Sequence, residues 1–178
     1  MSVSTCVPVA DPTVRVRAAG LADRLERGAK ALATFAGSLS DAEWRMPMPG
    51  DGRPVGVIVH HVATVYPLEV QLAQMMARGT PIVGVTWATI AEMNAGHAAD
   101  HRETPRDATL ALLNENSAAA AGVIRAFRDD ELDVAVTVSL YGDAELTAQF
   151  MLEDHAVRHS WHHLSRLQAA VEASRSAG

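Results

Sequence analysis

Apolar residues recur at helical spacing along most of the chain. Between residues 12 and 39 they form a single helical stripe, and Gly37 closes the run. A second run extends from about Pro54 to Arg78, with the proline in the first turn, where proline is favoured. Pro67 lies inside this run and predicts a kink, because proline lacks the backbone N–H and its ring meets the carbonyl four residues earlier. The pattern predicts two long helices in the first half of the chain.

Shorter elements separate these helices from the rest. Residues 40–43 read Ser-Asp-Ala-Glu, a capping-box arrangement that opens a short turn around Trp44. A connector at residues 79–86 is followed by a shorter, more polar helical segment over residues 87–101. The third long helix is predicted over residues 104–127, because it opens on Thr-Pro, a capping residue followed by proline at the first helical position.

The pattern changes before the last helix. Between residues 129 and 142, valine and leucine alternate with other residues, which is typical of a short strand or a hairpin arm. Helical spacing then returns, and it predicts the last helix from about residue 143 to about residue 173.

The number and order of these elements predict an all-α fold, a four-helix bundle with a short extra helix and an irregular or hairpin linker before the last helix. The chain has 178 residues, of which 48% are hydrophobic. That suffices for one core of ordinary size, whereas a second domain would be cramped. We therefore expect a single domain over residues 1–178, with disordered tails at residues 1–11 and 175–178.

Composition narrows the classes of function. The net charge is -6, and the sequence contains no basic stripe, which argues against nucleic acid as a partner. Cys6 is the only cysteine, which excludes a disulfide framework and fits a reducing compartment. Neither a secretory signal nor an apolar run long enough to span a bilayer is apparent. The sequence predicts a cytoplasmic protein with neither a membrane nor a nucleic-acid partner.

The eight histidines fall into three clusters, which suggests a metal site. At about 100° per residue, His61 lies in the middle of the apolar stripe of the second long helix. His159 and His163 lie one turn apart on one inward face of the last helix. Three imidazoles can bind one divalent metal and leave a coordination position open, as in catalytic sites. The predicted metal ligands are His61, His159 and His163.

The other histidines receive different interpretations. His155 lies four residues before the first ligand of the last helix and forms a competing pair, but it is turned toward the polar side. His97 and His101 form a third pair in a segment with little apolar periodicity, which favours a solvated face. His60 and His162 are expected to flank the site as rim or hydrogen-bonding residues.

Short motifs around both histidine groups are similar to those of a known family. Residues 54–62 end on His-His-Val, and residues 159–164 read His-Ser-Trp-His-His-Leu. The turn at Trp44, Asn94 in the connecting segment and the Asp-Asp-Glu-Leu of residues 129–132 agree with the same pattern. On these motifs, most of the chain resembles the DinB-like superfamily of bacterial four-helix-bundle metalloproteins.

The resemblance implies a bundle, often a homodimer, whose three-histidine site holds zinc or nickel, and His61, His159 and His163 map onto that site. Members with known activity include thiol S-transferases that use bacillithiol or mycothiol and a mycothiol-dependent maleylpyruvate isomerase. Two departures concern the substrate. Residues 53–54 are Arg-Pro where the family usually has Trp-Ser, and residues 164–166 are Leu-Ser-Arg where Arg-Gly-Gln often follows the last ligand.

Two functions of different classes follow. In the first, the chain is a metal-dependent enzyme that activates a low-molecular-weight thiol, or water, for transfer to a small electrophilic substrate. In the second, it is a non-catalytic metal-binding protein of the stress-response or interaction kind. A second apolar stripe on the last helix would then serve assembly, unless it faces a neighbouring helix; it consists of Val157, Trp161, Leu164 and Val171. Helical phase does not choose a catalytic acid or base among Glu69, Tyr66 and Asp154.

Overall fold

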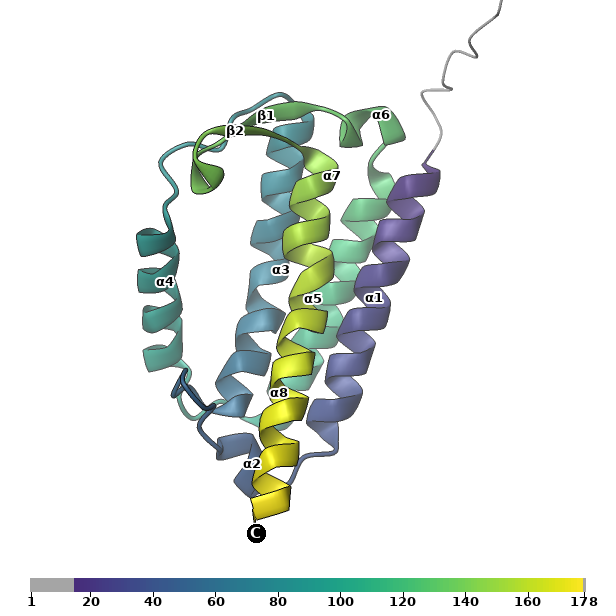
Figure 1. The fold of residues 1–178 in the computed structure, drawn as a ribbon. Helices are drawn as coiled ribbons and strands as arrows, with labels where there is room; N and C mark the ends of the chain where they lie inside the picture. The colour runs from purple at the N-terminus through teal and green to yellow at the C-terminus, as the bar shows by residue number, and fades with distance from the viewer. Residues whose placement is uncertain (1–14, 178) are drawn as a thin grey trace, which may run out of the picture.

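Four long helices form a bundle in the computed structural model, which describes residues 15–177 (Figure 1). They are α1 (Val16–Gly37), α3 (Val55–Ala77), α5 (Arg106–Ala126) and α8 (Arg158–Ala177). The prediction of an all-α four-helix bundle is confirmed. The N-terminal tail expected at residues 1–11 lies outside the described residues.

Shorter elements close the two ends of the bundle and flank one side (Figure 1). They are α2 (Asp41–Arg45), α4 (Trp87–Asp100), α6 (Asp129–Leu132), β1 (Ala135–Val138), the 3-10 turn η1 (Ser139–Tyr141), β2 (Ala144–Thr147), α7 (Ala148–Met151) and the π-helical turn η2 (Leu152–Val157). The hairpin lies at one end, α2 lies at the other, and α4 stands beside α3 (Figure 1).

The core lies between the long helices. α5 packs along both α1 and α3, and α8 packs against α1 and α3. The largest fully buried aliphatic side chains come from all four helices and from the segments before α8; they include Leu25, Leu32, Ile58, Leu113, Ile124, Leu152 and Leu167. Burying such side chains contributes roughly 1.5–3 kcal/mol each.

Helix α3 is the most apolar of the four. It is long and apolar enough to cross a membrane, but 67% of that apolar window is buried inside the bundle, as expected of a core helix. The helix continues without a break through Pro67. It ends at Ala77. Gly79, two residues later, has a φ of 75°, the left-handed conformation favoured after a helix end, and its N–H donates to the Met76 carbonyl.

The capping box predicted before Trp44 is present. The Ser40 hydroxyl accepts a hydrogen bond from the Glu43 N–H, and the Glu43 carboxylate accepts one from the Ser40 N–H at 2.7 Å. The Trp44 indole donates to the Thr104 carbonyl at 3.0 Å and thereby ties α2 to the loop before α5.

The predicted hairpin forms, but the last helix starts later than expected. β1 and β2 pair antiparallel, with Ala135 opposite Thr147 and Val138 opposite Ala144. The prediction that the last helix begins near residue 143 was wrong, because residues 144–147 complete the hairpin. The helix begins at Ala148, where the Thr147 side chain caps the Phe150 N–H.

The C-terminal helix extends beyond its predicted end. α8 runs to Ala177, and Arg175 forms a 2.6 Å ion pair with Glu43. The expected disorder was therefore wrong for residues 175–177.

The second apolar stripe of the last helix packs inside the bundle. Val157, Leu164 and Val171 are buried, whereas Trp161 is 44% exposed. The Trp161 indole lies over Gly28 of α1, where a Cβ atom would lie 2.8 Å from Trp161 Nε1. This stripe faces the neighbouring helix, and only Trp161 remains available to a partner.

Candidate metal centre

The bundle brings the three predicted ligands together. His61 of α3 faces His159 and His163 of α8, and one ring nitrogen from each lies within 4.8 Å of the others. His61 Nε2 and His159 Nε2 are 3.2 Å apart. Two imidazole nitrogens that bind zinc tetrahedrally at about 2.0–2.1 Å lie about 3.3 Å from each other. The donor set and its spacing fit one divalent metal.

Burial keeps two of these imidazoles neutral. His61 and His163 are each 7% exposed. Burial, followed by the neighbouring His159, lowers the pKa of His61 to about 3, and the same causes lower the pKa of His163 to about 2. Neutral imidazole is the form that binds metals. His163 Nδ1 is buried and has no hydrogen-bond partner among the described residues.

Glu69 orients His159. This carboxylate is 5% exposed, and its Oε1 atom accepts a hydrogen bond of 2.5 Å from His159 Nδ1. The hydrogen bond places the proton on Nδ1, so the lone pair on Nε2 points toward His61. A carboxylate behind a histidine is a common partner of metal-binding imidazoles, because it fixes the tautomer and raises the basicity of the ring.

The other two acid–base candidates differ in access to the site. Tyr66 is fully buried, its hydroxyl is hydrogen-bonded to Ser160, and burial raises the pKa of the phenol. Asp154 lines the pocket beside the histidines and accepts a 2.6 Å hydrogen bond from the Tyr141 hydroxyl. His155 Nε2 lies 3.0 Å from the same hydroxyl. His155 is thus part of the pocket wall and not of the group formed by His61, His159 and His163, which we call the α3–α8 trio.

The α3–α8 trio opens into a pocket of about 370 Å³. α3 and α8 form its floor, and the connector, α4 and the hairpin form the opposite wall. Ser139 holds this wall together, because its hydroxyl donates to the Val85 carbonyl and accepts from the Val85 N–H. Most of the lining is apolar, including Leu68, Ile90 and Met93. Such a pocket suits a small ligand with few polar groups.

Arg53 is a pocket residue that helical phase missed. Its Nε and Nη2 atoms donate to the Asp51 carboxylate at 2.6 and 2.8 Å, which fixes the guanidinium. Within the described part of the chain, its Nη1 atom is buried and unpaired. Arg53 precedes the first residue of α3, so its position on a helical face is undefined. The one sequence signal for Arg53 was that it stands where the resembled family usually has tryptophan.

The interpretation of His97 and His101 as a solvated face was wrong. Both are half-buried, and both pack against the ring of His60. Their contacts are polar, so an apolar stripe could not reveal them. His162 is exposed at the pocket rim, beside His163.

The family model of the DinB superfamily matches residues 24–167. The chain belongs to the DinB superfamily. Among curated proteins, none matches the sequence.

Two solved structures show the same fold. YfiT from Bacillus subtilis, described as a probable metal-dependent hydrolase with an unusual four-helix bundle topology, has a TM-score of 0.72 at 17% identity, covering 95% of this chain and 93% of YfiT. ClbS, a colibactin self-resistance protein, has a TM-score of 0.66 at 18% identity, covering 91% of this chain and 97% of ClbS.

The prediction that nucleic acid is excluded as a partner was wrong. The structure of ClbS is a complex with double-stranded DNA. Net charge is a sum over the whole surface and does not determine the charge at any one contact. A net charge of -6 therefore does not exclude a nucleic-acid partner for a chain of this fold.

Proposed function

We propose that this DinB superfamily member is a metal-dependent enzyme whose divalent metal, zinc or nickel, is held by His61, His159 and His163. The observation that carries the proposal is the convergence of these three imidazoles on a pocket floor, with Glu69 behind one of them. Such an ion, when bound, would supply Lewis-acid chemistry that lowers the pKa of a thiol or of water toward neutral pH.

The residues around the three histidines would bind the substrate and transfer protons. The unpaired Nη1 atom of Arg53 suits a carboxylate or another anionic group of the substrate. Asp154 and His155, both joined to the Tyr141 hydroxyl, are placed to accept or return a proton at the pocket wall. The apolar side chains opposite exclude water from the reacting groups.

We propose a low-molecular-weight thiol as the nucleophile and a small electrophile with an anionic group as its acceptor. The thiol sulfur forms a bond to the electrophilic carbon as the bond between that carbon and its leaving group breaks. The leaving group departs with the bonding electrons, and the thiol proton passes to the pocket wall, which can return it to the leaving group. Water in place of the thiol would give hydrolysis, the activity suggested for YfiT.

Zinc or nickel content, measured on protein purified without a histidine tag, tests the metal site. We expect His163→Ala to lose the metal bound at this site and His162→Ala to retain it, because His162 is an exposed neighbour outside the trio. If metal content were below about a tenth of an ion per chain and unchanged in His163→Ala, the metal site would be refuted.

Thermal shifts and turnover measurements distinguish a thiol nucleophile from water. We compare the thermal shifts caused by four thiols: bacillithiol, mycothiol, glutathione and coenzyme A. Turnover is then measured with each thiol, using a generic electrophile and an activated ester as substrates. Thiol-dependent turnover that His163→Ala abolishes supports the transferase, and thiol-independent ester cleavage supports a hydrolase. Metal binding without turnover in any assay would contradict the enzyme and favour a metal-binding protein. Duplex DNA is included among the ligands.

A further inference from the structure

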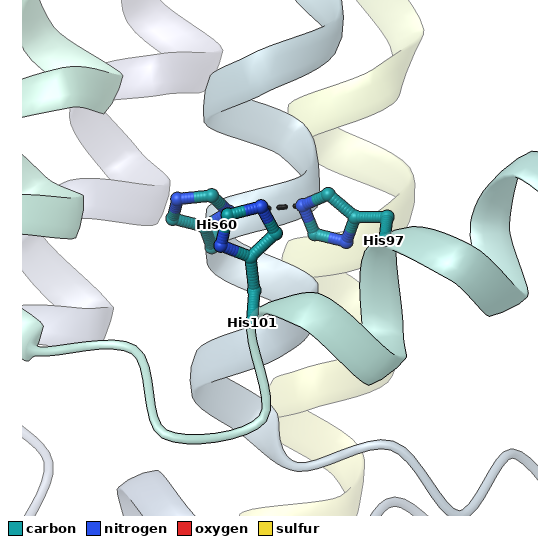
Figure 2. Close-up of side chains that lie close together, drawn as sticks. All are labelled: His60, His97 and His101. Atoms are coloured by element: carbon teal, nitrogen blue, oxygen red, sulfur yellow. Dashed lines mark hydrogen bonds between the residues drawn. The ribbon is translucent and has the colours of Figure 1, made fainter.

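A second group of three histidines lies between α3 and α4 (Figure 2). His60 projects from α3, and His97 and His101 project from the end of α4, with the three rings directed at one another. Ring centroids are 4.1 Å apart for His60 and His101, 4.7 Å for His97 and His101, and 5.1 Å for His60 and His97. We call this group the α3–α4 trio.

The nitrogens of the α3–α4 trio converge as those of the first group do. One ring nitrogen from each histidine lies within 4.8 Å of the other two. His60 Nδ1 and His97 Nε2 are 2.9 Å apart, close to the spacing of about 3.3 Å for two nitrogens on one tetrahedral zinc ion. His97 Nδ1, in addition, is buried without a hydrogen-bond partner among residues 15–177.

Helix α4 has little else to hold it against α3. None of its residues, all of which the structure describes, is fully buried, and Trp87 and Met93 are 62% and 53% exposed. A helix of a compact domain is normally held by a buried apolar face. Helix α4 instead meets α3 through the histidines, so an ion bound among them would cross-link the two helices.

We propose that His60, His97 and His101 form a second site for a divalent transition metal, and that this ion clamps α4 to α3. Three imidazoles suit zinc, nickel, cobalt or copper, whereas magnesium and calcium prefer oxygen ligands. Because α4 contributes Ile90 and Met93 to the pocket wall, the clamp would also fix the shape of the substrate pocket.

The two sites use different residues. His60 and His61 are adjacent in α3 but point about 100° apart, so one faces α4 and the other faces α8. His97 of the α3–α4 trio lies edge-on to His61 of the first site, with 5.6 Å between the ring centroids. The α3–α4 trio can therefore be tested whether or not the first site binds metal.

Zinc stoichiometry of the full chain, after removal of metal by a chelator and titration with zinc alone, tests the proposal. We expect about two ions per chain in the wild type, about one in His97→Gln/His101→Gln and about one in His163→Ala. His162→Ala is the matched control and should bind about two. Combining His163→Ala with the His97 and His101 substitutions should leave almost none, which also measures any residual binding by His61 and His159.

The decisive comparison is between His163→Ala and the triple variant. Equal zinc content in these two proteins would overturn the second site. Loss of zinc on substituting His97 and His101, with no further loss on substituting His163, would support the second site and refute the first. Failure of each site is thus recognised separately.

Hydrogen exchange over residues 87–100 gives a second readout, because it reports the clamp itself. Zinc should slow exchange of these amides at least about tenfold in the wild type and in His163→Ala, but not in His97→Gln/His101→Gln. Exchange in α4 that zinc leaves unchanged in all three proteins would overturn the clamp. Since α4 buries no residue completely, the substituted chains should retain the bundle, which far-ultraviolet circular dichroism checks.

Discussion

At the scale of single residues, Glu69 determines how His159 presents its ring. The hydrogen bond to Nδ1 leaves Nε2 free on the side of His61, 3.2 Å from the neighbouring nitrogen. Glu69 also has a buried oxygen, Oε2, without a partner among the described residues. A buried carboxylate in this position is stabilised when the imidazole in front of it carries positive charge, or when a cation lies beyond that imidazole.

Replacing Glu69 by glutamine should weaken metal binding while the three histidines remain in place. The amide accepts a weaker hydrogen bond and carries no charge, so we expect zinc affinity to fall about 10–100-fold. The substitution is made in His97→Gln/His101→Gln protein, which lacks the second site. A competition titration against a coloured chelator then measures zinc affinity at the first site alone. Glu153→Gln is the control, because Glu153 pairs with Arg24 on the outside of the bundle. Equal zinc affinity in the Glu69 and Glu153 variants would contradict the role of Glu69.

Metal-free protein should lose stability as the pH falls below about 6.5. The unfolded chain binds protons on His61 and His163 near pH 6.5, whereas the folded chain does so only near pH 3 and 2. Stability is therefore independent of these groups above 6.5 and decreases below it, by about 1.4 kcal/mol per pH unit for each histidine.

Urea unfolding in the presence of a chelator, at pH 7.5 and at pH 5.5, measures this dependence. In His163→Asn, one of the two histidines no longer takes up a proton on unfolding, so the loss of stability between the two pH values should be smaller. A loss as large as that of the wild type would show that His163 is not held neutral by the fold.

At the scale of elements, the contact between α2 and α3 depends on a glycine. Trp44 packs on Gly56 so closely that a Cβ atom there would lie 2.5 Å from Trp44 Nε1. The indole cannot retreat without losing its hydrogen bond to the Thr104 carbonyl. The contact allows the first turn of α3, next to Arg53, to lie against α2.

Gly56→Ala should destabilise the protein by about 1–3 kcal/mol, because the added methyl group displaces the indole. Gly20→Ala is the matched control, since Gly20 is also inside a helix but has open space around it. That substitution should be neutral or stabilise by up to about 1 kcal/mol. Chemical unfolding of both variants distinguishes the two effects, and equal stabilities would contradict the packing argument.

The long helices could be predicted because each buries one apolar face, and the same phase selected His61, His159 and His163, which the structure brings together. Prediction failed at particular positions where apolar periodicity was absent. Residues 144–147 contain an alternation too short to distinguish a strand from a helix start, and pairing with β1 determines the outcome. α4 meets the bundle through imidazoles, and Arg53 lies just outside a helix. The hydrophobic pattern therefore predicted neither the histidine contacts of α4 nor the place of Arg53 in the pocket.

At the scale of the whole molecule, the proposed first metal site joins helices that are far apart in sequence. His61 belongs to α3, and its two partners belong to α8. An ion that binds only when these helices are assembled stabilises the folded state according to its concentration and affinity.

Zinc should therefore raise the melting temperature of chelator-treated protein. At about 100 times the dissociation constant, the gain is about 2.7 kcal/mol, or about 5–10 °C for a chain of this size. Thermal unfolding with and without zinc measures the shift in His97→Gln/His101→Gln, which isolates the first site. Adding His163→Ala to this variant should remove most of the shift. A shift that persists undiminished would mean that zinc binds elsewhere.

The π-helical turn at residues 152–157 bears on how related chains are aligned. A π turn holds one more residue than an α turn, so it absorbs a single inserted residue without rotating the helix on either side. A relative without this extra residue would have an α-helix here and would still direct its last two histidines inward. Correct alignment then requires a gap inside a helix, two to seven positions before His159, where alignment methods penalise gaps most heavily. An ungapped alignment across this turn would shift the histidine pair by one position and hide a shared group of three histidines.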